Sequence, residues 1–323
     1  MNEELKNKKC LVTGATGLIG QTLVKKLRTL DVKILAVVRN VEKARLLFGD
    51  DDKIDYIISD VTNLSVPKIE LDYIIHAASV TSSKSFVLDP VGVSYTALEG
   101  TKNTLEIARV NSVKGYVFLS SMEVYGTPGT DEKIDELHFT DLNTMQPRSA
   151  YPESKRMCES LCASYASQFE VPAKVIRLTQ TFGPGVQYND GRVFAEFARC
   201  AIEGKDIILH TKGETKRSYL HTDDAAEAVL SVLVRGIKGE AYNAANEDTY
   251  CSIYEMAQFV ANRIAHGRIK VIIQEDDTGM YGYAPTLHIN LDTAKLRKLG
   301  WKPRHDLEDM FVSMCESMTQ NHR

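Results

Sequence analysis

The chain of 323 residues lacks the cysteine and histidine spacings that mark metal sites and redox-active thiols. It contains six cysteines and eight histidines, but no CxxC pair, no HxH and no HExxH pattern. Cys158 and Cys162 lie one helical turn apart, and we interpret them as small apolar residues packed under a helix. The sequence therefore predicts no bound metal.

Long apolar runs and long runs of basic residues are also missing. No uninterrupted apolar stretch approaches the ~20 residues that span a bilayer, and residues 1–9 are too polar for a signal peptide. The 39 Lys and Arg residues are outnumbered by 43 Asp and Glu residues, so the formal net charge is −4. A slightly acidic chain is a poor ligand for nucleic acid or an anionic membrane. We expect a cytoplasmic protein with neither partner.

Internal repeats, low-complexity segments and flexible linkers are absent, and the first half of the chain alternates short apolar runs with helical patterns. The runs predict strands at residues 9–13, 33–38, 54–59, 71–76, 113–120 and 173–178. Strands that are apolar on both faces and separated by helices form parallel sheets covered on both sides. The expected fold class is α/β, a Rossmann-type doubly wound parallel sheet with a smaller C-terminal substrate-binding region.

A glycine-rich turn follows the first expected strand and opens the helical pattern at residues 18–30. Its residues are Gly14, Ala15, Thr16, Gly17, Leu18, Ile19 and Gly20. Gly14 permits a tight turn, Gly17 lets the backbone approach a pyrophosphate, and Gly20 lets the helix pack closely on the strand. Phosphates then lie at a helix N-terminus, where free N–H groups and the helix dipole favour an anion. The turn therefore predicts dinucleotide binding.

Six motifs, in order along the chain, resemble those of the extended short-chain dehydrogenase/reductase superfamily, which contains nucleotide-sugar epimerases, dehydratases and decarboxylases. They are TGATGLIG from Thr13, Asp60-Val61 after the third strand, HAAS from His76, SSMEVYG from Ser120, YPESK from Tyr151 and LGWKP from Leu299. The resemblance covers nearly the whole chain, from Val12 to about Pro303. It implies that the cofactor's adenine contacts Asp60 and Val61. The segment that it places beside the nicotinamide ribose comprises Ala77, Ala78 and Ser79.

The end of the second strand bears on the choice between NAD and NADP. An acidic residue there binds both hydroxyls of the adenosine ribose and selects NAD. This chain has Val38 followed by Arg39, and a planar guanidinium pairs well with a 2′-phosphate. A solvated arginine at a strand end is the alternative. We expect NAD(P) as cofactor, with a preference for NADP.

Tyr151 and Lys155 occupy positions i and i+4 of a helical pattern and so share one helical face. A phenol with a reference pKa of about 10 is a poor base until a nearby cation stabilises its phenolate. Lys155 and an oxidised nicotinamide are such cations. The resemblance implies that Tyr151 is the acid/base of hydride transfer, that Lys155 is its partner, and that Ser121 binds the sugar oxygen.

Glu123 bears on the reaction, because the dehydratases and decarboxylases that this motif resembles carry a glutamate two positions after the catalytic serine or threonine. Its carboxylate suits removal of the C5 proton once C4 is a ketone. Dehydratases place an acid just before this glutamate, whereas this chain has Met122, which donates no proton. Simple 4,6-dehydration is therefore disfavoured. A locally paired, structural Glu123 is an equally good interpretation.

Substrate-binding residues are expected at three places after the sixth strand. Gln180 replaces an asparagine usual in the family and still offers an amide N–H to a phosphate. Arg192 and Val193 belong to NDGRV at residues 189–193, which resembles the decarboxylase and dehydratase branch. Arg217 lies in the segment whose arginine grips the pyrophosphate in the family, and a guanidinium binds such an anion bidentately. Solvated surface arginines are the alternative for Arg192 and Arg217.

These expectations combine into a nucleotide-sugar epimerase/dehydratase-type enzyme that transfers a hydride at sugar C4 through a 4-keto intermediate. An NADPH-dependent 4-keto-sugar reductase and a nucleotide-sugar decarboxylase are enzymatic alternatives, and a redox-sensing dinucleotide-binding protein is the non-enzymatic one. Residues 1–180, with return segments from about 215–245, are expected to bind NAD(P). Residues 181–323 are expected mainly to bind the nucleotide sugar.

The resemblance also implies a homodimer built on two long helices per subunit, at about 90–110 and 151–169. The second helix carries Met157, Leu161 and Tyr165 at i, i+4 and i+8, an apolar stripe suited to burial against a partner. Packing of this stripe inside its own subunit is the alternative. Disorder is expected only at residues 1–7 and 320–323.

Overall fold

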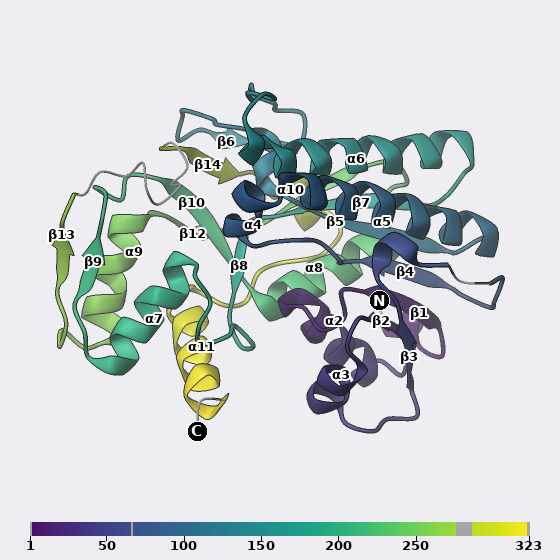
Figure 1. The fold of residues 1–323 in the computed structure, drawn as a ribbon, viewed down its shortest axis with the longest axis horizontal. Coiled ribbons are helices and arrows are strands. Elements are labelled where there is room, and N and C mark those ends of the chain that lie inside the picture. The colour runs from purple at the N-terminus through teal and green to yellow at the C-terminus, as the bar shows by residue number, and fades with distance from the viewer. Residues whose placement is uncertain (1, 66, 276–285, 322–323) are drawn as a thin grey trace.

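A seven-stranded sheet forms the centre of the computed structural model, which describes residues 2–65, 67–275 and 286–321 (Figure 1). Its order is β11-β7-β5-β4-β1-β2-β3, and every neighbouring pair is parallel. Its strands are β1 (Lys9–Thr13), β2 (Lys33–Val38), β3 (Ile54–Ile58), β4 (Tyr73–His76), β5 (Gly115–Ser121), β7 (Ala173–Leu178) and β11 (Ala241–Ala244). The six strands expected from the sequence are all present, and the predicted fold class is confirmed.

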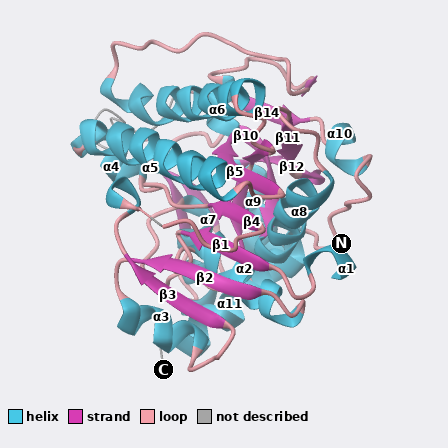
Figure 2. Ribbon diagram, turned by 90° about the vertical axis from the view of Figure 1, so that its right-hand side faces the viewer, coloured by secondary structure: helices cyan, strands magenta, loops and turns pink. Residues whose placement is uncertain are grey.

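Helices cover both faces of this sheet, as Figure 2 shows. One apolar layer lies under α2 (Leu18–Thr29) and α8 (Thr222–Arg235), whose leucines and valines pack on the strands. A second layer lies under α5 (Pro90–Asn111) and α6 (Ala150–Gln168). Burial on both faces explains why the strands are continuously apolar rather than alternating.

Cys158 and Cys162 face the second apolar layer and are 0% and 1% exposed. Both thiols are free, and burial raises the pKa of each. They are therefore packing residues under a helix, as the sequence predicted.

The order in which successive strands join the sheet reverses at β1, and this switch point positions the site. β1 is followed outward by β2 and β3, whereas β4 and β5 lie on its other side. In an open parallel sheet, ligands bind in the crevice at the carboxyl ends of the strands on either side of such a point. Gly14 directly follows β1 and Ala77 directly follows β4, so both lie at this crevice.

The later part of the chain builds a smaller layer beside the large sheet. Its sheet has the order β12-β10-β14-β6, β8 pairs with β10, and β13 pairs with β9. The strands are β6 (Lys133–Ile134), β8 (Gln180–Phe182), β9 (Ile207–Leu209), β10 (Lys216–His221), β12 (Asn246–Ser252), β13 (Val271–Ile273) and β14 (His288–Leu291). Three helices enclose a separate apolar core with β9 and β10: α7 (Val193–Glu203), α9 (Ile253–Phe259) and α11 (Leu307–Asn321).

Shorter elements complete the described chain. They are α1 (Asn2–Leu5), α3 (Val41–Phe48), α4 (Ser83–Leu88), α10 (Ala294–Arg297), the 3-10 turns η1 (Val61–Asn63), η2 (Met122–Tyr125) and η3 (Pro147–Ser149), and the π-helical turn η4 (Val260–Ile264). None of the helices within these ranges is both long and apolar enough to cross a membrane.

The expectation of disorder at the two ends is wrong for the residues that can be described. The N-terminal segment folds into α1, and Leu5 is completely buried in the first apolar layer. At the other end, α11 continues to Asn321. Tertiary burial orders these ends, an effect that local polarity does not reveal.

Candidate active site

The glycine-rich turn between β1 and α2 has no room for side chains at two of its glycines. Gly14 has φ +65°, and a Cβ there would lie 2.7 Å from the backbone nitrogen of Ala78. A Cβ on Gly20 would lie 2.0 Å from the carbonyl oxygen of Gly14. Gly17 is the exposed N-cap of α2, and no side chain caps that helix end. The first N–H groups of α2 therefore face the crevice, as anion binding requires.

The other residues of the turn hold it to both parts of the protein. Ile19 packs on the first apolar layer, and Leu18 packs on the core of the smaller region. Thr16 is half-buried. The turn thus lies where the two regions meet, which is where a ligand shared by both would bind.

The ends of β1 and β4 are joined by polar contacts. Thr13 Oγ1 lies 2.7 Å from His76 Nδ1 and accepts a hydrogen bond of 3.2 Å from the Ala78 backbone N–H. Burial lowers the pKa of His76 to about 3, so its imidazole is neutral. Ser79 turns its hydroxyl to the carbonyl of Val80. Ala77, Ala78 and Ser79 consequently run along the crevice opposite Gly14.

Asp60 and Arg39 face each other at the far end of the crevice. Asp60 accepts hydrogen bonds from the backbone and hydroxyl of Thr62, at 3.0 and 2.8 Å, and these bonds lower the pKa of Asp60. Arg39 Nη1 lies 3.8 Å from an Asp60 oxygen, and the arginine side chain is 83% exposed. Val61 is buried beneath α5, where a Cβ on Gly100 would lie 2.8 Å from it. The structure thus places Asp60, Val61 and Arg39, the residues expected near the adenosine of the cofactor, close together, and the Arg39 guanidinium is exposed to solvent.

Tyr151 lies in the first turn of α6 and is 7% exposed. Its ring stacks on Phe86 of α4, with ring centres 4.2 Å apart. Burial and the charge of Glu123 raise the pKa of the Tyr151 phenol, whereas hydrogen bonding by Ser121 and the charge of Arg148 lower it. Ser121 Oγ also accepts the backbone N–H of Glu123 at 3.2 Å. The predicted residues Ser121, Glu123 and Tyr151 therefore meet at one phenol.

Lys155 lies near Tyr151, and its ammonium is hydrogen-bonded to a backbone carbonyl. Nζ donates to the carbonyl of Leu119 at 2.8 Å, lies 4.6 Å from the centre of the Phe118 ring, and is 5.8 Å from the centre of the Tyr151 ring. Burial lowers the pKa of Lys155 to about 8. The helical spacing placed this lysine correctly, but its partner in this structure is a backbone carbonyl.

Arg148 is a site residue that the sequence analysis missed. It lies in η3, three residues before Tyr151, and its Nη1 donates to Glu123 Oε2 at 2.9 Å. Its guanidinium carbon lies 5.6 Å from the centre of the Phe86 ring. Its position three residues before the tyrosine that we expect to be the acid/base was the available signal, because such spacing shares a helical face. The local pairing that was the alternative for Glu123 is therefore present, and it lies at the phenol.

Met122 separates Glu123 from the strand and contributes no acid. It is 4% exposed, and its sulfur accepts a hydrogen bond from Thr179 Oγ1 at 3.4 Å. A thioether has no proton to donate. Of the residues of η2, Glu123 alone therefore offers a carboxylate to the Tyr151 phenol, and no second acid precedes it.

The two expected phosphate arginines differ in their surroundings. Arg192 is held by Asp190 through both carboxylate oxygens, with bonds of 2.6 and 3.0 Å. Arg217 lies on β10, and its buried Nε donates to no acceptor in the described part of the chain. Gln180 opens β8, which pairs with β10 two residues beyond Arg217, and Val193 begins α7. Arg217 is thus the arginine poised for an anion, because a buried N–H without a partner is costly.

His221, Asp223 and His305 bring their possible ligand atoms within 4.8 Å of one another. His221 already has two partners: Nδ1 accepts the backbone N–H of Asp223 at 3.1 Å, and Nε2 lies 3.2 Å from Ser313 Oγ. Its ring also stacks on His305, with centres 4.0 Å apart. This geometry makes His221 the N-cap of α8, and parallel rings do not converge on one ion.

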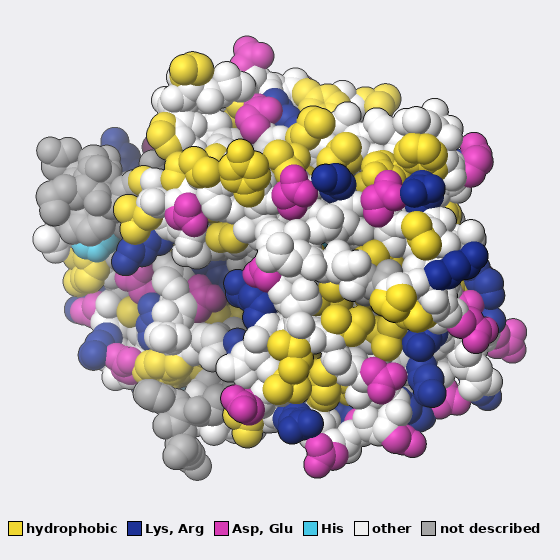
Figure 3. Space-filling model, turned by 45° about the vertical axis from the view of Figure 1, so that its right-hand side comes forward, with side chains coloured by type: hydrophobic (Ala, Val, Ile, Leu, Met, Phe, Trp, Pro, Cys, Tyr) yellow, Lys and Arg dark blue, Asp and Glu magenta, His cyan; other side chains and the backbone are white. Residues whose placement is uncertain are grey.

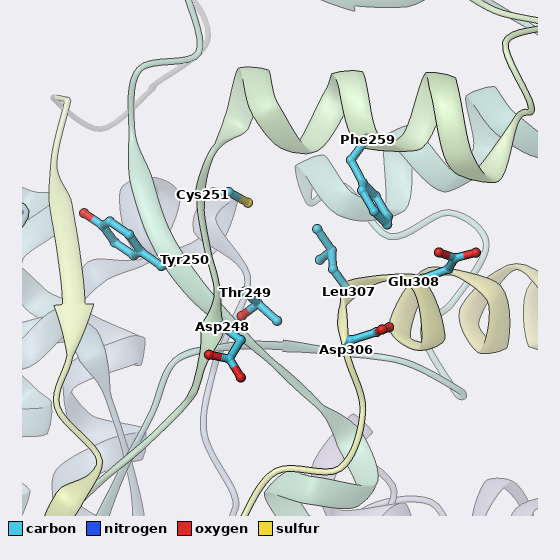
Figure 4. A pocket seen from close by; sticks show the side chains of 8 residues that line it. All are labelled: Asp248, Thr249, Tyr250, Cys251, Phe259, Asp306, Leu307 and Glu308. Carbon is cyan, nitrogen blue, oxygen red and sulfur yellow. The ribbon is translucent and has the colours of Figure 1, made fainter.

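A separate hollow of about 260 Å³ opens in the smaller region, and Figure 4 shows the side chains around it. It is lined by Asp248, Thr249, Tyr250, Cys251, Phe259, Asp306, Leu307 and Glu308. None of these residues belongs to the crevice at the large sheet. The hollow is therefore a surface feature apart from the candidate active site.

Comparison with known proteins agrees with this geometry. The model of the NAD dependent epimerase/dehydratase family matches residues 10–245, more than half of the chain. UDP-glucuronic acid decarboxylase 1 of Xenopus tropicalis is 28% identical over 310 residues, covering 95% of this chain and 71% of that protein. UDP-N-acetyl-alpha-D-glucosaminuronate decarboxylase of Bacillus cytotoxicus is 28% identical over 303 residues, covering 90% of this chain and 91% of that protein.

A solved structure shares the fold. UDP-glucose 4-epimerase of Thermotoga maritima superimposes with a TM-score of 0.82 at 20% identity, covering 98% of this chain and all of that one. The family match extends over the glycine-rich turn, the Tyr151 helix and the seven strands of the large sheet. The chain therefore belongs to the NAD-dependent epimerase/dehydratase family of nucleotide-sugar enzymes.

Proposed function

We propose that the protein oxidises a nucleotide sugar at C4 to a 4-keto intermediate and that loss of the C6 carboxyl group follows when the sugar is a hexuronate. The observation that carries the proposal is the convergence of Ser121, Glu123 and Arg148 on the buried phenol of Tyr151. This group lies at the carboxyl edge of the large sheet, where the glycine-rich turn also lies. A hydroxyl, a phenol and an adjacent cation are the groups that C4 oxidation requires.

The glycine-rich turn fits a dinucleotide, because its glycines let the turn pack against β4 and leave the exposed N-terminus of α2 without a side-chain cap. Gly14, Gly17 and Gly20 would hold the pyrophosphate at the N-terminus of α2. The adenine would lie at Asp60 and Val61. When bound, the oxidised nicotinamide supplies the acceptor for the hydride that leaves sugar C4. We infer that residues 1–180, with the returning segment at 215–245, hold this cofactor, and that residues 181–323 hold most of the nucleotide sugar.

Tyr151 is the proton acceptor in this proposal. Its Oη takes the proton of the C4 hydroxyl, while Ser121 hydrogen-bonds the same sugar oxygen. The pKa of Tyr151 is raised by burial and lowered by Arg148 and Arg192, so these cations favour the phenolate that the step needs. Lys155, 5.8 Å from the ring centre, adds a third positive charge.

Loss of a carboxyl group suits this site better than loss of water. A ketone at C4 makes the C6 acid a β-keto acid. The C5–C6 bond then breaks, its electron pair forms an enolate, carbon dioxide leaves, and C5 takes up a proton. Dehydration instead needs an acid for the departing hydroxyl, and Met122 is a buried thioether. The decarboxylases among the relatives support the same choice.

The test is incubation of the purified protein with UDP-glucuronic acid in D₂O, with the product identified by mass and NMR. The proposal expects one carbon dioxide for each sugar nucleotide and one deuterium on C5 of a five-carbon sugar. Tyr151→Phe is expected to lower turnover by at least about 100-fold while nucleotide binding persists. Tyr254→Phe, which alters a tyrosine that is 38% exposed on α9, is the matched control.

Two outcomes would contradict the proposal. A product that retains six sugar carbons and has no carbon-bound deuterium rejects decarboxylation and leaves epimerase or reductase chemistry. Wild-type turnover by Tyr151→Phe rejects the C4 mechanism itself.

A preference for NADP is a further part of the proposal. Arg39 follows β2, where an acidic residue would select NAD. Its pairing with Asp60 at 3.8 Å is exposed, and such a pair is weak. The guanidinium is consequently available to a 2′-phosphate, whose second charge it matches.

We also infer a homodimer through α5 and α6, because apolar side chains lie exposed there. Figure 3 shows hydrophobic side chains gathered across the upper part of this face. Val91 and Tyr95 on α5, Met157 on α6 and Leu88 at the end of the neighbouring α4 are between 51% and 69% exposed. Leu161 and Tyr165 of the expected stripe are instead partly buried on the second apolar layer. A surface of this kind on two neighbouring helices that run side by side suits a second copy of the chain.

A further inference from the structure

The guanidinium of Arg148 has hydrogen-bonding capacity that the protein does not use. An arginine carries five N–H donors in a planar fork. Nη1 of Arg148 donates to Glu123 Oε2 at 2.9 Å, and in the described ranges Nε and Nη2 donate to no protein acceptor. The side chain is 32% exposed and that of Glu123 is 27% exposed, so both reach the crevice rather than the core. One edge of the fork therefore remains open beside the candidate active site.

The position of this fork is tied to that of Tyr151. Phe86 stacks on the Tyr151 ring at 4.2 Å, and the guanidinium carbon of Arg148 lies 5.6 Å from the centre of Phe86. Arg148 also precedes Tyr151 by three residues in η3 and α6. These contacts hold the open donors at a set place relative to the hydroxyl that receives the C4 proton. In a hexose ring, C6 is attached to C5, the carbon next to C4.

Of the three cations near Tyr151, Arg148 is the one whose charge is most available to an anionic ligand. Arg192 is already paired with Asp190 through two oxygens, and Lys155 Nζ is buried against the Leu119 carbonyl. Glu123 is an anion at the same place and repels a second carboxylate. Arg148 removes this obstacle only by bonding both groups, which its planar fork permits.

We propose that Arg148 is a specificity-determining residue that bridges Glu123 and the C6 carboxylate of a nucleotide hexuronate, and so selects an acidic sugar over a neutral hexose. This inference rests on the C4 oxidation proposed above and names the group that recognises C6. Glu123 also contributes to this specificity, because its hydrogen bond orients the Arg148 guanidinium. The bridge stabilises the bound carboxylate, so its loss raises KM more than it lowers kcat.

The experiment compares UDP-glucuronic acid with UDP-glucose, which differ only in a C6 carboxylate or hydroxymethyl group. Arg148→Gln and Arg148→Lys are assayed for binding of each sugar nucleotide by calorimetry and for the first reduction of added cofactor by absorbance. In Arg148→Gln, loss of a charge-assisted hydrogen bond is expected to lower the binding affinity for UDP-glucuronic acid by roughly 10- to 100-fold. The binding affinity for UDP-glucose is expected to change by less than about 3-fold, and Arg148→Lys is expected to restore part of the lost affinity for UDP-glucuronic acid.

Two controls separate a binding role from a structural one. Arg109→Gln makes the same charge change on α5, where Arg109 pairs with Glu106 on the surface, and is expected to leave the discrimination unchanged. Affinity for UDP alone reports the integrity of the remaining site in every variant.

Three outcomes would overturn the inference. If Arg148→Gln lowers the affinity for both sugar nucleotides equally, Arg148 has a structural role and does not recognise the C6 carboxylate. If it weakens neither, the carboxylate is bound elsewhere. If the unaltered protein reduces the cofactor with neither sugar nucleotide, the proposed C4 oxidation itself is rejected. This outcome is distinct from the other two because it is measured without any variant.

Discussion

The burial of Lys174 allows us to predict how the free energy of unfolding changes with pH. The prediction rests on one hydrogen bond and one shifted pKa. Lys174 is the second residue of β7, between β5 and β11, and is 4% exposed. Its Nζ donates to the carbonyl of Leu233, in the last turn of α8, at 3.1 Å. Burial lowers the pKa of Lys174 from its ordinary value of 10.5 to about 8. The ammonium at neutral pH is therefore a buried charge.

The size of the effect follows from this shift. A lowering of about 2.5 pKa units corresponds to a penalty of roughly 3 kcal/mol when the ammonium is charged in both states. Lys174→Met removes the charge and keeps the length of the side chain, but leaves the Leu233 carbonyl without its donor, which costs about 1 kcal/mol. The free energy of unfolding is expected to rise by about 2 kcal/mol at pH 7 as the difference of these two effects.

The sign of the pH dependence is the decisive part. Between pH 8 and 10.5 the unfolded chain binds the Lys174 proton more strongly than the folded one, so the unaltered protein gains stability as pH rises. Lys174→Met lacks this contribution. The amount by which Lys174→Met exceeds the unaltered protein in free energy of unfolding is therefore expected to be constant below pH 8 and to decrease above it. Near pH 10.5 the difference is expected to vanish or change sign. Other titrating groups cancel in the difference between the two proteins.

Urea unfolding of both proteins at pH 7, 8, 9 and 10 measures this difference. Lys33→Met, at the exposed first position of β2, is the matched control and is expected to show no trend. An advantage of Lys174→Met that stays constant from pH 7 to 10 would refute the reasoning, and so would a variant less stable than the unaltered protein at pH 7. In the second case the bond to Leu233 would outweigh the burial of charge.

Four further changes test the site. Gly20→Ala sets a Cβ 2.0 Å from the Gly14 carbonyl, and this overpacking of about 1–3 kcal/mol is expected to weaken dinucleotide binding in a fluorescence titration; unchanged affinity would mean that the turn does not hold the cofactor. Burial lowers the pKa of Lys155 to about 8, so kcat/KM is expected to fall about tenfold per pH unit above pH 8, whereas Lys155→Arg should keep its charge and extend the plateau. A flat profile to pH 10 in the unaltered protein would remove the ammonium from the mechanism. Arg39→Ala is expected to lower the ratio of NADP to NAD affinity roughly tenfold; an unchanged ratio in calorimetry makes Arg39 a solvated residue. Met157→Glu, at a side chain 51% exposed on α6, is expected to give a monomer by light scattering at micromolar concentration where the unaltered chain is a dimer, and a monomeric unaltered chain contradicts the interface.

Local chemistry by itself determined much of this protein. The apolar runs predicted the six strands within two residues at their ends, because strands buried on both faces carry continuous apolar side chains. The spacing of Gly14, Gly17 and Gly20 predicted the turn, since backbone conformation and close approach depend on neighbouring residues. Tyr151 and Lys155 were placed on one helical face because helical geometry is periodic.

The side-chain partners required the tertiary structure. Arg148 reaches Glu123 across 25 residues of sequence, and Lys155 meets the Leu119 carbonyl across 36. Neither pairing is encoded in a local pattern, because η3, α6 and β5 come together only when the second apolar layer packs. The same holds for the two terminal segments, whose order depends on burial against distant elements.

The contrast between Arg192 and Arg217 shows the reason most clearly. Both were predicted from the sequence to bind phosphate, Arg217 from a segment that resembles a pyrophosphate-binding one and Arg192 from the NDGRV segment. In the folded chain Arg192 is held by Asp190, two residues away, whereas Arg217 Nε is buried on β10 with no acceptor among the described residues. A motif supplies a residue type at a position, but the charge available to a ligand depends on which neighbours the packed chain brings within hydrogen-bonding distance.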